Sequence, residues 1–318
     1  MENWECSNRK RWRKSWGIMA NNKLLIRGFD KCPERTLGFG DMMYYFMVCY
    51  FRGKYLGYDE IHTFKPLYHP KVINIGDSNT WQSTPYLPIT LLKQPVYDAE
   101  YDLVLDISVP GSLFEGHKGM HKHFWETCRY LNLYYLNTNK APYLTDKRTW
   151  KGTPYIIFQY RYMDKSFDNI CVHNPYRNTS FTDFEDIFNL FRNQYGDKYE
   201  YWKIGEPTPI DDKFDYILPP MWNDIDGFAE IVRNTSMLVT AQSGPNAFSI
   251  FHNNTPCIVI SSIENTCWDN PQVWKRIVGT GSGIVFPLWH MDKMLTIRKE
   301  CVNQNINVIK QFNDKWLL

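Results

Sequence analysis

The chain has 318 residues, of which 43% are hydrophobic and 22% charged, an ordinary globular balance with enough apolar material for two cores. Its formal net charge of +2 provides no global field that would attract the protein to polyanions. The longest apolar run near the start, residues 42–51, is far short of the roughly 20 residues that a membrane span needs.

Five basic residues surround Trp12 near the start of the chain: Arg9, Lys10, Arg11, Arg13 and Lys14. Such a run is typical either of a solvated terminus or of a segment that binds nucleic acid or an anionic membrane surface. No apolar segment follows it, so the sequence predicts no signal peptide and a cytoplasmic protein. The eight cysteines include no Cys-x-x-Cys pair, and we expect free thiols rather than a zinc or redox site.

Short β-rich runs alternate with helical stretches along the chain, which predicts parallel sheets with helices on their faces. In the first half we expect strands at residues 23–29, 60–64 and 101–107 and helices at 42–52 and 121–133. In the second half we expect strands at residues 154–158, 199–204, 215–218, 236–240 and 256–260. Helices are expected at 182–192, with Ser180 or Thr182 as N-cap, and at 227–234, 243–251 and 291–315.

The expected fold is α/β, with two Rossmann-like domains that face a cleft. We expect a basic lead (1–22), an N-terminal domain (23–140), a polar linker (141–153), a second domain (154–290) and closing helices (291–318). In open α/β sheets, ligands bind outside the carboxyl ends of the strands. The cleft between the two domains is therefore the expected ligand site.

The strand at 236–240 runs into a tight turn at Ser243 and Gly244, and Pro245 follows in the first turn of the next helix. Proline is preorganised for that position. Ser243 and the backbone N–H groups up to Asn246 can bind an anion, and the helix dipole favours a phosphate there. The alternative is an ordinary strand–turn–helix connection with good capping.

A second turn, with Gly38, Gly40 and Asp41, precedes the helix at 42–52. The two glycines let the backbone approach a ligand closely, and Asp41 would face the cleft from the start of that helix. The alternative is that Asp41 caps the helix and the glycines only form the turn.

Together the two turns resemble the heptosyltransferases of the bacterial lipopolysaccharide core. That family carries a Gly-x-Gly-Asp-like turn near the N-terminus and, later, a strand followed by Asp-Ser/Thr-Gly-x-x-His. Residues 38–41 correspond to the first motif and residues 242–247 to the second. Residues 177–184 resemble the family's Lys-x-Trp-Pro-x-x-x-Phe helix start, and residues 202–206 its strand ending in a ribose-contacting Glu. The resemblance covers about residues 23–260.

The resemblance implies the two-Rossmann glycosyltransferase fold known as GT-B. It also implies transfer of a sugar from a nucleotide-sugar donor to an acceptor hydroxyl, with inversion and without a metal or a cofactor. Asp41 would be the base that takes the acceptor proton. The donor diphosphate would be bound by the N–H groups of residues 243–246 together with Arg177 and Arg161. Glu206 would contact the ribose.

Two positions depart from the family pattern, because Gln242 stands where the family has Asp and Ala247 where it has His. Both positions lie beside the sugar diphosphate in the family, so the donor sugar stays open. We expect Gln242 to lie with Glu206 near the ribose and base of the donor.

Two histidines, His117 and His121, are expected on the acceptor side together with Gly38 and Gly40. Their spacing of four residues fits one face of a helix and hence a metal. Gly116 and Gly119 disfavour such a helix, so we predict acceptor contacts or a solvated segment and no metal.

Three functions follow from these observations. The first is a glycosyltransferase that acts on a glycan. The second is a glycosyltransferase that acts on a hydroxylated base of viral DNA, motivated by the basic segment and by the 12 Trp and 21 Tyr, which can hold an extruded base. The third is a catalytically inactive binding module, motivated by the two departures from the family.

Overall fold

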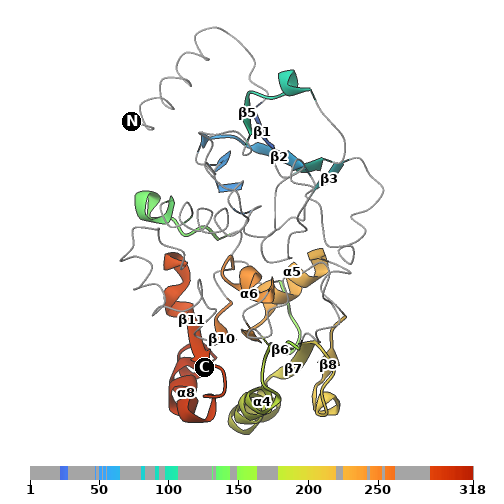
Figure 1. Cartoon of the computed structure of the whole chain (residues 1–318), viewed down its shortest axis with the longest axis vertical. Helices are drawn as coiled ribbons and strands as arrows, with labels where there is room; N and C mark the ends of the chain where they lie inside the picture. The colour runs from blue at the N-terminus through green and yellow to red at the C-terminus, as the bar shows by residue number, and fades with distance from the viewer. Residues whose placement is uncertain are drawn as a thin grey trace.

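The structure, a computed structural model, describes residues 22–27, 47, 50–51, 53–54, 56–64, 80–82, 90–92, 97–106, 131, 134–143, 149–162, 178–219, 225–241, 244–252, 255–261 and 287–317. Two β-sheets lie in opposite halves of the molecule (Figure 1). The α/β class and the parallel sheets expected from the sequence are confirmed. The division into two domains with a cleft between them remains a prediction.

The first sheet has the strand order β3-β4-β2-β1-β5. Its strands are β1 (Lys23–Arg27), β2 (Glu60–Phe64), β3 (Thr80–Gln82), β4 (Thr90–Leu92) and β5 (Leu103–Asp106). β1 is parallel to both β2 and β5, and β2 is parallel to β4, whereas β3 is antiparallel to β4. The sequence predicted β1, β2 and β5 but missed β3 and β4. Runs of three residues are too short to show an alternation of apolar side chains.

The second sheet has six strands in the order β11-β10-β9-β6-β7-β8, and every neighbouring pair is parallel. Its strands are β6 (Tyr155–Tyr160), β7 (Glu200–Gly205), β8 (Tyr216–Ile217), β9 (Met237–Ala241), β10 (Cys257–Ser261) and β11 (Met294–Arg298). Numbered along the chain, the order is 3-2-1-4-5-6. This is the strand order of dinucleotide-binding sheets.

Helices flank the second sheet: α4 (Phe181–Tyr195), α5 (Ile225–Asn234), α6 (Gly244–Ser249) and α8 (Ile306–Trp316). Short 3-10 turns are η1 (Asp98–Glu100), η4 (Gly196–Lys198), η5 (Asp211–Lys213), η7 (Leu288–Lys293) and η8 (Asn303–Asn305). The predicted helices at 182–192, 227–234 and 243–251 correspond to α4, α5 and a shorter α6. Ser180 is the N-cap of α4, and its side chain accepts a hydrogen bond from the Asp183 backbone N–H at 3.2 Å.

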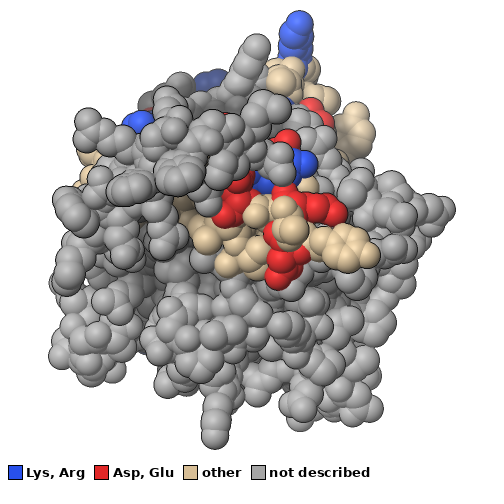
Figure 2. Space-filling model, turned by 90° about the horizontal axis from the view of Figure 1, so that it is seen from above, with Lys and Arg blue, Asp and Glu red and all other residues tan. Residues whose placement is uncertain are grey.

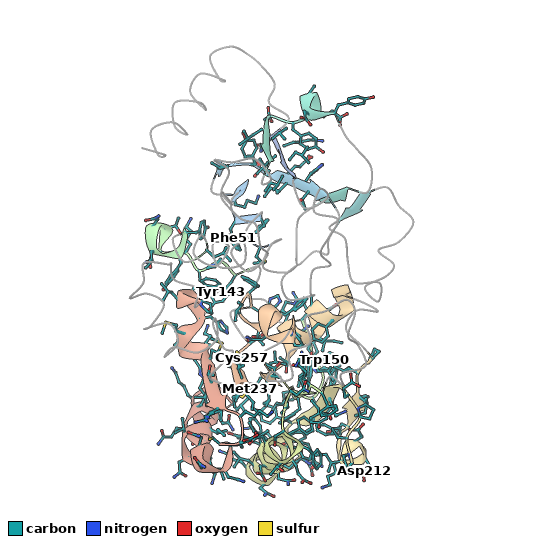
Figure 3. The ribbon with its side chains drawn as sticks, viewed as in Figure 1. Phe51, Tyr143, Trp150, Asp212, Met237 and Cys257 are labelled. Carbon is teal, nitrogen blue, oxygen red and sulfur yellow. The ribbon has the colours of Figure 1, made fainter. Side chains whose placement is uncertain are left out.

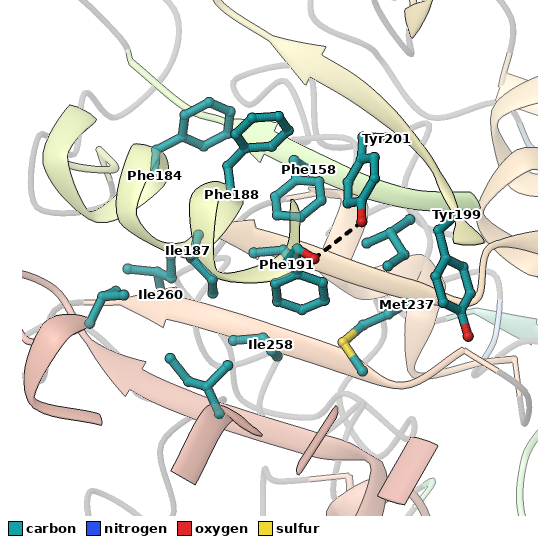
Figure 4. Packing of buried hydrophobic residues seen from close by; sticks show 14 of the residues in the cluster. Phe158, Phe184, Ile187, Phe188, Phe191, Tyr199, Tyr201, Met237, Ile258 and Ile260 are labelled. Atoms are coloured by element: carbon teal, nitrogen blue, oxygen red, sulfur yellow. Dashed lines mark hydrogen bonds between the residues drawn. The ribbon is translucent and has the colours of Figure 1, made fainter. Parts of the chain in front are cut away.

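The core of this half lies between the sheet and α4 (Figure 4). Phe158 of β6 is completely buried, and its ring packs edge-on against Phe188 and Phe191 of α4. These helix residues are spaced three or four apart, so a single face of α4 covers the strands. The buried Tyr201 hydroxyl donates to the Phe191 carbonyl oxygen at 3.2 Å, which satisfies its polar end inside the core.

The predicted closing helices at 291–315 are wrong for residues 294–298, which form strand β11 beside β10. Met294 and Ile297 are buried there, and only residues 306–316 form the helix α8. The apolar positions that suggested a helix also fit a strand, and pairing with β10 satisfies the backbone groups of this segment.

Tyr143, from the predicted linker, contacts the turn η7 (Figure 3). Its hydroxyl lies 2.8 Å from the Trp289 carbonyl oxygen and 3.1 Å from Nδ1 of the fully buried His290. A hydroxyl has one proton, so it donates to the carbonyl and accepts from the Nδ1–H of a neutral imidazole. Tyr143 therefore ties the linker to the C-terminal part of the chain.

Acidic side chains gather at the end of the molecule that carries the first sheet (Figure 2). Exposed Asp59 and Glu60 lie at the amino end of β2, and exposed Asp98 and Glu100 precede β5. Lys23 pairs with Glu60 at 3.0 Å. This surface is at the amino ends of the strands, opposite the edge at which ligands bind in such sheets. Among the described residues, no helix combines the length and apolar character needed to cross a membrane.

Candidate functional site

The strand order of the second sheet reverses between β6 and β9. From β6 the chain continues outward to β7 and β8 on one side, and it then returns to add β9, β10 and β11 on the other. In related sheets, ligands bind at the carboxyl ends of the two strands between which the order reverses. Arg161 directly follows β6, and α6 begins three residues after the end of β9. Two of the predicted diphosphate-binding elements therefore follow the carboxyl ends of neighbouring strands.

Arg161 is half-buried and lies beside the start of α4. Its Nη1 donates to Asn178 Oδ1 at 3.0 Å, and its carbonyl oxygen accepts from the Thr179 backbone N–H at 2.8 Å. A guanidinium held in this way keeps its charge and presents several donors, which suits it to a phosphate.

Glu206 lies next to Arg161, because the ends of β6 and β7 approach closely. Its backbone N–H donates to the Tyr160 carbonyl oxygen at 3.0 Å, while its side chain is exposed. Gly205 permits this approach: its φ is +100°, and a Cβ there would lie only 1.9 Å from the Tyr160 oxygen. The structure thus brings together Arg161 and Glu206, which the sequence placed in one donor site.

The start of α6 differs in part from the expectation. Gly244 is half-exposed, but Pro245 is buried and Asn246 is only 1% exposed. The Asn246 Oδ1 lies 3.7 Å from Cys257 Sγ, inside the fold. A ligand at this edge can therefore meet the backbone of α6 but not the Asn246 side chain. Cys257 and Cys301 are free thiols, as expected.

Several predicted site residues lie outside the described residues. These are Asp41, Gly38, Gly40, His117, His121, Arg177, Gln242 and Ser243. Within the described part of the chain, no group of three or more His, Cys, Asp or Glu side chains could hold a metal ion.

Two described residues near this edge, Tyr162 and Lys203, were missed by the sequence analysis. Tyr162 is 52% exposed directly after Arg161, and its ring is parallel to that of Tyr160, with the centroids 6.5 Å apart. Lys203 is completely buried, and its Nζ lies 2.9 Å from Asp211 Oδ1. In β7, Lys203 lies between Trp202 and Ile204, and a lysine between two large apolar residues of a strand is an unusual feature that the sequence alone displays.

Near the carboxyl ends of β6 and β9, a polar pair joins these two strands. Thr240 of β9 donates its hydroxyl to Gln159 Oε1 of β6, and both side chains are buried. This bond lies one residue before the end of each strand. It therefore adds a side-chain link between β6 and β9 where their backbones end.

No family model matches the chain, and no curated protein matches it significantly. Among solved structures, the heptosyltransferase WaaC of E. coli with ADP superimposes with a TM-score of 0.51 at 11% identity, over 92% of this chain and 99% of that one. WaaC with ADP-2-deoxy-2-fluoro heptose gives a TM-score of 0.50 at the same identity and coverage. The ADP-heptose LPS heptosyltransferase II of E. coli gives 0.48 at 12% identity, over 91% of this chain and 98% of that one.

The chain therefore shares an α/β fold with parallel sheets with such glycosyltransferases. Among them, the heptosyltransferases resembled by the sequence motifs are also similar to it in structure, so this resemblance is confirmed at the level of the fold.

Proposed function

We propose that this protein is a glycosyltransferase that binds a nucleotide-sugar donor at the carboxyl ends of β6, β7 and β9. The observation that carries the proposal is that Arg161 and Glu206 follow the ends of the paired strands β6 and β7, next to the point between β6 and β9 where the strand order reverses. Crevices at this point bind nucleotides in related sheets. WaaC, which shares the fold, has been solved with ADP, and we use that molecule as the first test ligand.

In this proposal the donor half of the site stabilises the leaving nucleoside diphosphate. Arg161, Arg177 and the backbone N–H groups of Ser243, Gly244 and Asn246 supply preorganised donors for the charge that develops there. Glu206 accepts hydrogen bonds from ribose hydroxyls. The two arginines and the backbone N–H groups provide positive potential without a metal ion.

The acceptor half is proposed from the sequence. Asp41 takes the proton of the acceptor hydroxyl as the new bond forms, and the reaction inverts the anomeric centre. We propose a saccharide acceptor, which contacts the segments around Gly38, Gly40, His117 and His121. Nothing in the part of the chain that the structure describes favours a DNA acceptor or an inactive binding module, so neither is proposed.

A thermal-shift experiment without added metal tests the donor site. The purified protein is heated with ADP, GDP, UDP or CDP, and a ligand at about 100 times its Kd stabilises the folded state by about 2.7 kcal/mol. One of these nucleotides is expected to raise the Tm. Arg161→Ala is expected to weaken its binding about 10- to 100-fold, because a hydrogen bond to a charged group is lost.

Arg298→Ala is the matched control. Arg298 is an exposed arginine at the carboxyl end of β11 on the same sheet, two strands away from β9. Its removal changes the net charge equally and should leave nucleotide binding intact. No shift with any of the four nucleotides would contradict the proposal. Asp41→Ala should abolish sugar transfer while the nucleotide still binds.

A further inference from the structure

Lys203 is a buried cation for which the proposed chemistry has no direct use. It lies in β7, two residues before the end of the strand, and none of its surface is exposed. Removing an ammonium group from water is costly unless it is paired and its donors are satisfied. The partners that Lys203 uses therefore indicate what the lysine holds in place.

The Lys203 side chain contacts two groups of the segment that follows β7. Its Nζ donates to the Glu206 carbonyl oxygen at 2.6 Å and lies 2.9 Å from Asp211 Oδ1. The same Asp211 oxygen accepts from the backbone N–H of Thr208 at 3.1 Å and from the Thr208 hydroxyl. The ammonium group thus closes residues 206–211 into a loop by binding both of its ends.

The Asp211 carboxylate stays ionised in this arrangement. Burial opposes its ionisation, but the hydrogen bonds from Thr208 and Lys203 outweigh that effect and lower the pKa of Asp211. The Asp211 carboxylate thus faces the Lys203 Nζ inside the fold, at 2.9 Å.

The backbone of Glu206 is held from two sides. Its N–H donates to Tyr160 at the end of β6, and its carbonyl oxygen accepts from Lys203. Only the exposed side chain remains free to adapt. The backbone from which this carboxylate extends is therefore already ordered before the side chain accepts hydrogen bonds from a ligand.

We propose that Lys203 is a positioning residue, which holds Glu206 so that its carboxylate distinguishes a ribose from a deoxyribose. This inference rests on the proposed function, because it takes the ligand of Glu206 to be the ribose of the donor. Lys203 itself does not touch the ligand. Its effect on binding passes through the backbone of Glu206 and should be specific for the sugar hydroxyls.

The test compares a ribonucleotide with its 2′-deoxy counterpart by calorimetry. The Kd values of ADP, GDP, UDP and CDP are compared with those of dADP, dGDP, dUDP and dCDP. For the base that binds best, the Kd of the deoxynucleotide is divided by the Kd of the ribonucleotide. For the wild type we expect a ratio of about 10 or more, because a hydrogen bond to a carboxylate is lost. Lys203→Met should reduce the ratio towards one, because it weakens the binding of the ribonucleotide and leaves the binding of the deoxynucleotide unchanged.

Lys213→Met is the control. Lys213 lies in the same loop region and is exposed, and its Nζ pairs with Glu185 Oε1 at 4.0 Å rather than with Glu206 or Asp211, so its removal should leave the ratio unchanged. A general loss of stability would weaken both nucleotides equally and would not change the ratio. If Lys203→Met does not fold, Asp211→Asn breaks the same loop from its more exposed side and should lower the ratio as well.

A double variant gives a further check, because Lys203→Met should add nothing to Glu206→Gln if the two act as one unit. Nucleotide binding with an unchanged ratio in both Lys203→Met and Asp211→Asn would overturn the inference and leave the proposed function standing. A wild type that binds a nucleotide with a ratio of one would also overturn it. If the wild type binds no nucleotide, the proposed function fails and the inference fails with it.

Discussion

At Gly205 the backbone takes a φ of +100°, which L side chains rarely adopt, and the space for a Cβ is occupied by the Tyr160 carbonyl oxygen. Gly205→Ala is therefore expected to destabilise the protein by at least about 3 kcal/mol, since backbone strain and steric overlap add. Urea denaturation measures the loss.

Gly196→Ala is the matched comparison for this prediction. Gly196 also has a positive φ, of +53°, but a Cβ there would meet no atom within 4 Å. Gly196→Ala should therefore lower the free energy of unfolding only by the strain of the backbone, about 1–3 kcal/mol. Equal losses for the two variants would show that the contact with Tyr160 relaxes and that the approach of β6 and β7 is not tight.

The site residues were proposed from the resemblance to the heptosyltransferases, and the structure can be compared only with their places along the chain. Arg161 and Glu206 follow the ends of strands, and parallel strands bring such residues to one edge. The burial of the Asn246 side chain could not be predicted, because it depends on Cys257 of the neighbouring strand. Lys203 gave a signal as a charged residue in a buried strand, but its partners depend on how the following loop folds.

The start of α4 depends on a single hydroxyl. Ser180→Ala removes the acceptor for the Asp183 N–H and should destabilise the protein by about 1 kcal/mol, the usual contribution of such a cap. Thr182→Ala is the control, because Thr182 is exposed inside the first turn and caps nothing in the helix. Chemical denaturation of both variants measures the difference, and a larger effect of Thr182→Ala would contradict the assignment of the cap.

Among the helices and strands, the sequence predicted those with a clear local signal. The capping serine and the apolar period fixed α4, whereas residues 294–298 were assigned to a helix although they form β11. Met294 and Leu295 fit the apolar period of a helix as well as that of a strand. The segment forms a strand because it pairs with the edge of β10, and no local sequence pattern reveals that pairing.

The stability of the whole molecule should depend on the protonation of His290. Burial, helped by the nearby Lys293, lowers the pKa of His290 from its ordinary value of 6.5 to about 3. Between these values the unfolded chain binds a proton that the folded protein excludes. Stability should therefore fall as the pH decreases below about 6.5, by up to about 1.4 kcal/mol per pH unit.

His290→Phe isolates this contribution. The variant is expected to lose some stability near pH 7.5, where the contact with Tyr143 is removed, but its stability should fall less steeply towards pH 5. Other titrating groups are common to both proteins and cancel in the difference between the two curves. Parallel curves, measured by urea denaturation at several pH values, would contradict a neutral buried His290.

The class of the fold could be predicted from alternating strands and helices, because that pattern reflects how each segment packs on its neighbours. The order of the strands could not, since it depends on the direction in which each connection crosses the sheet. The site follows from this order. The same residues in another order would place Arg161 and α6 apart.

The strand order also bears on how the chain can fold during synthesis. β6 is the first strand of the second sheet to leave the ribosome, and in the complete sheet it lies between β9 and β7. β7 and β8 then extend the sheet on one side, and β9, β10 and β11 extend it on the other. Each new strand meets a free edge and never has to insert between two strands that are already paired. This half of the protein can thus grow strand by strand, although parallel pairing over long sequence separations is generally slow.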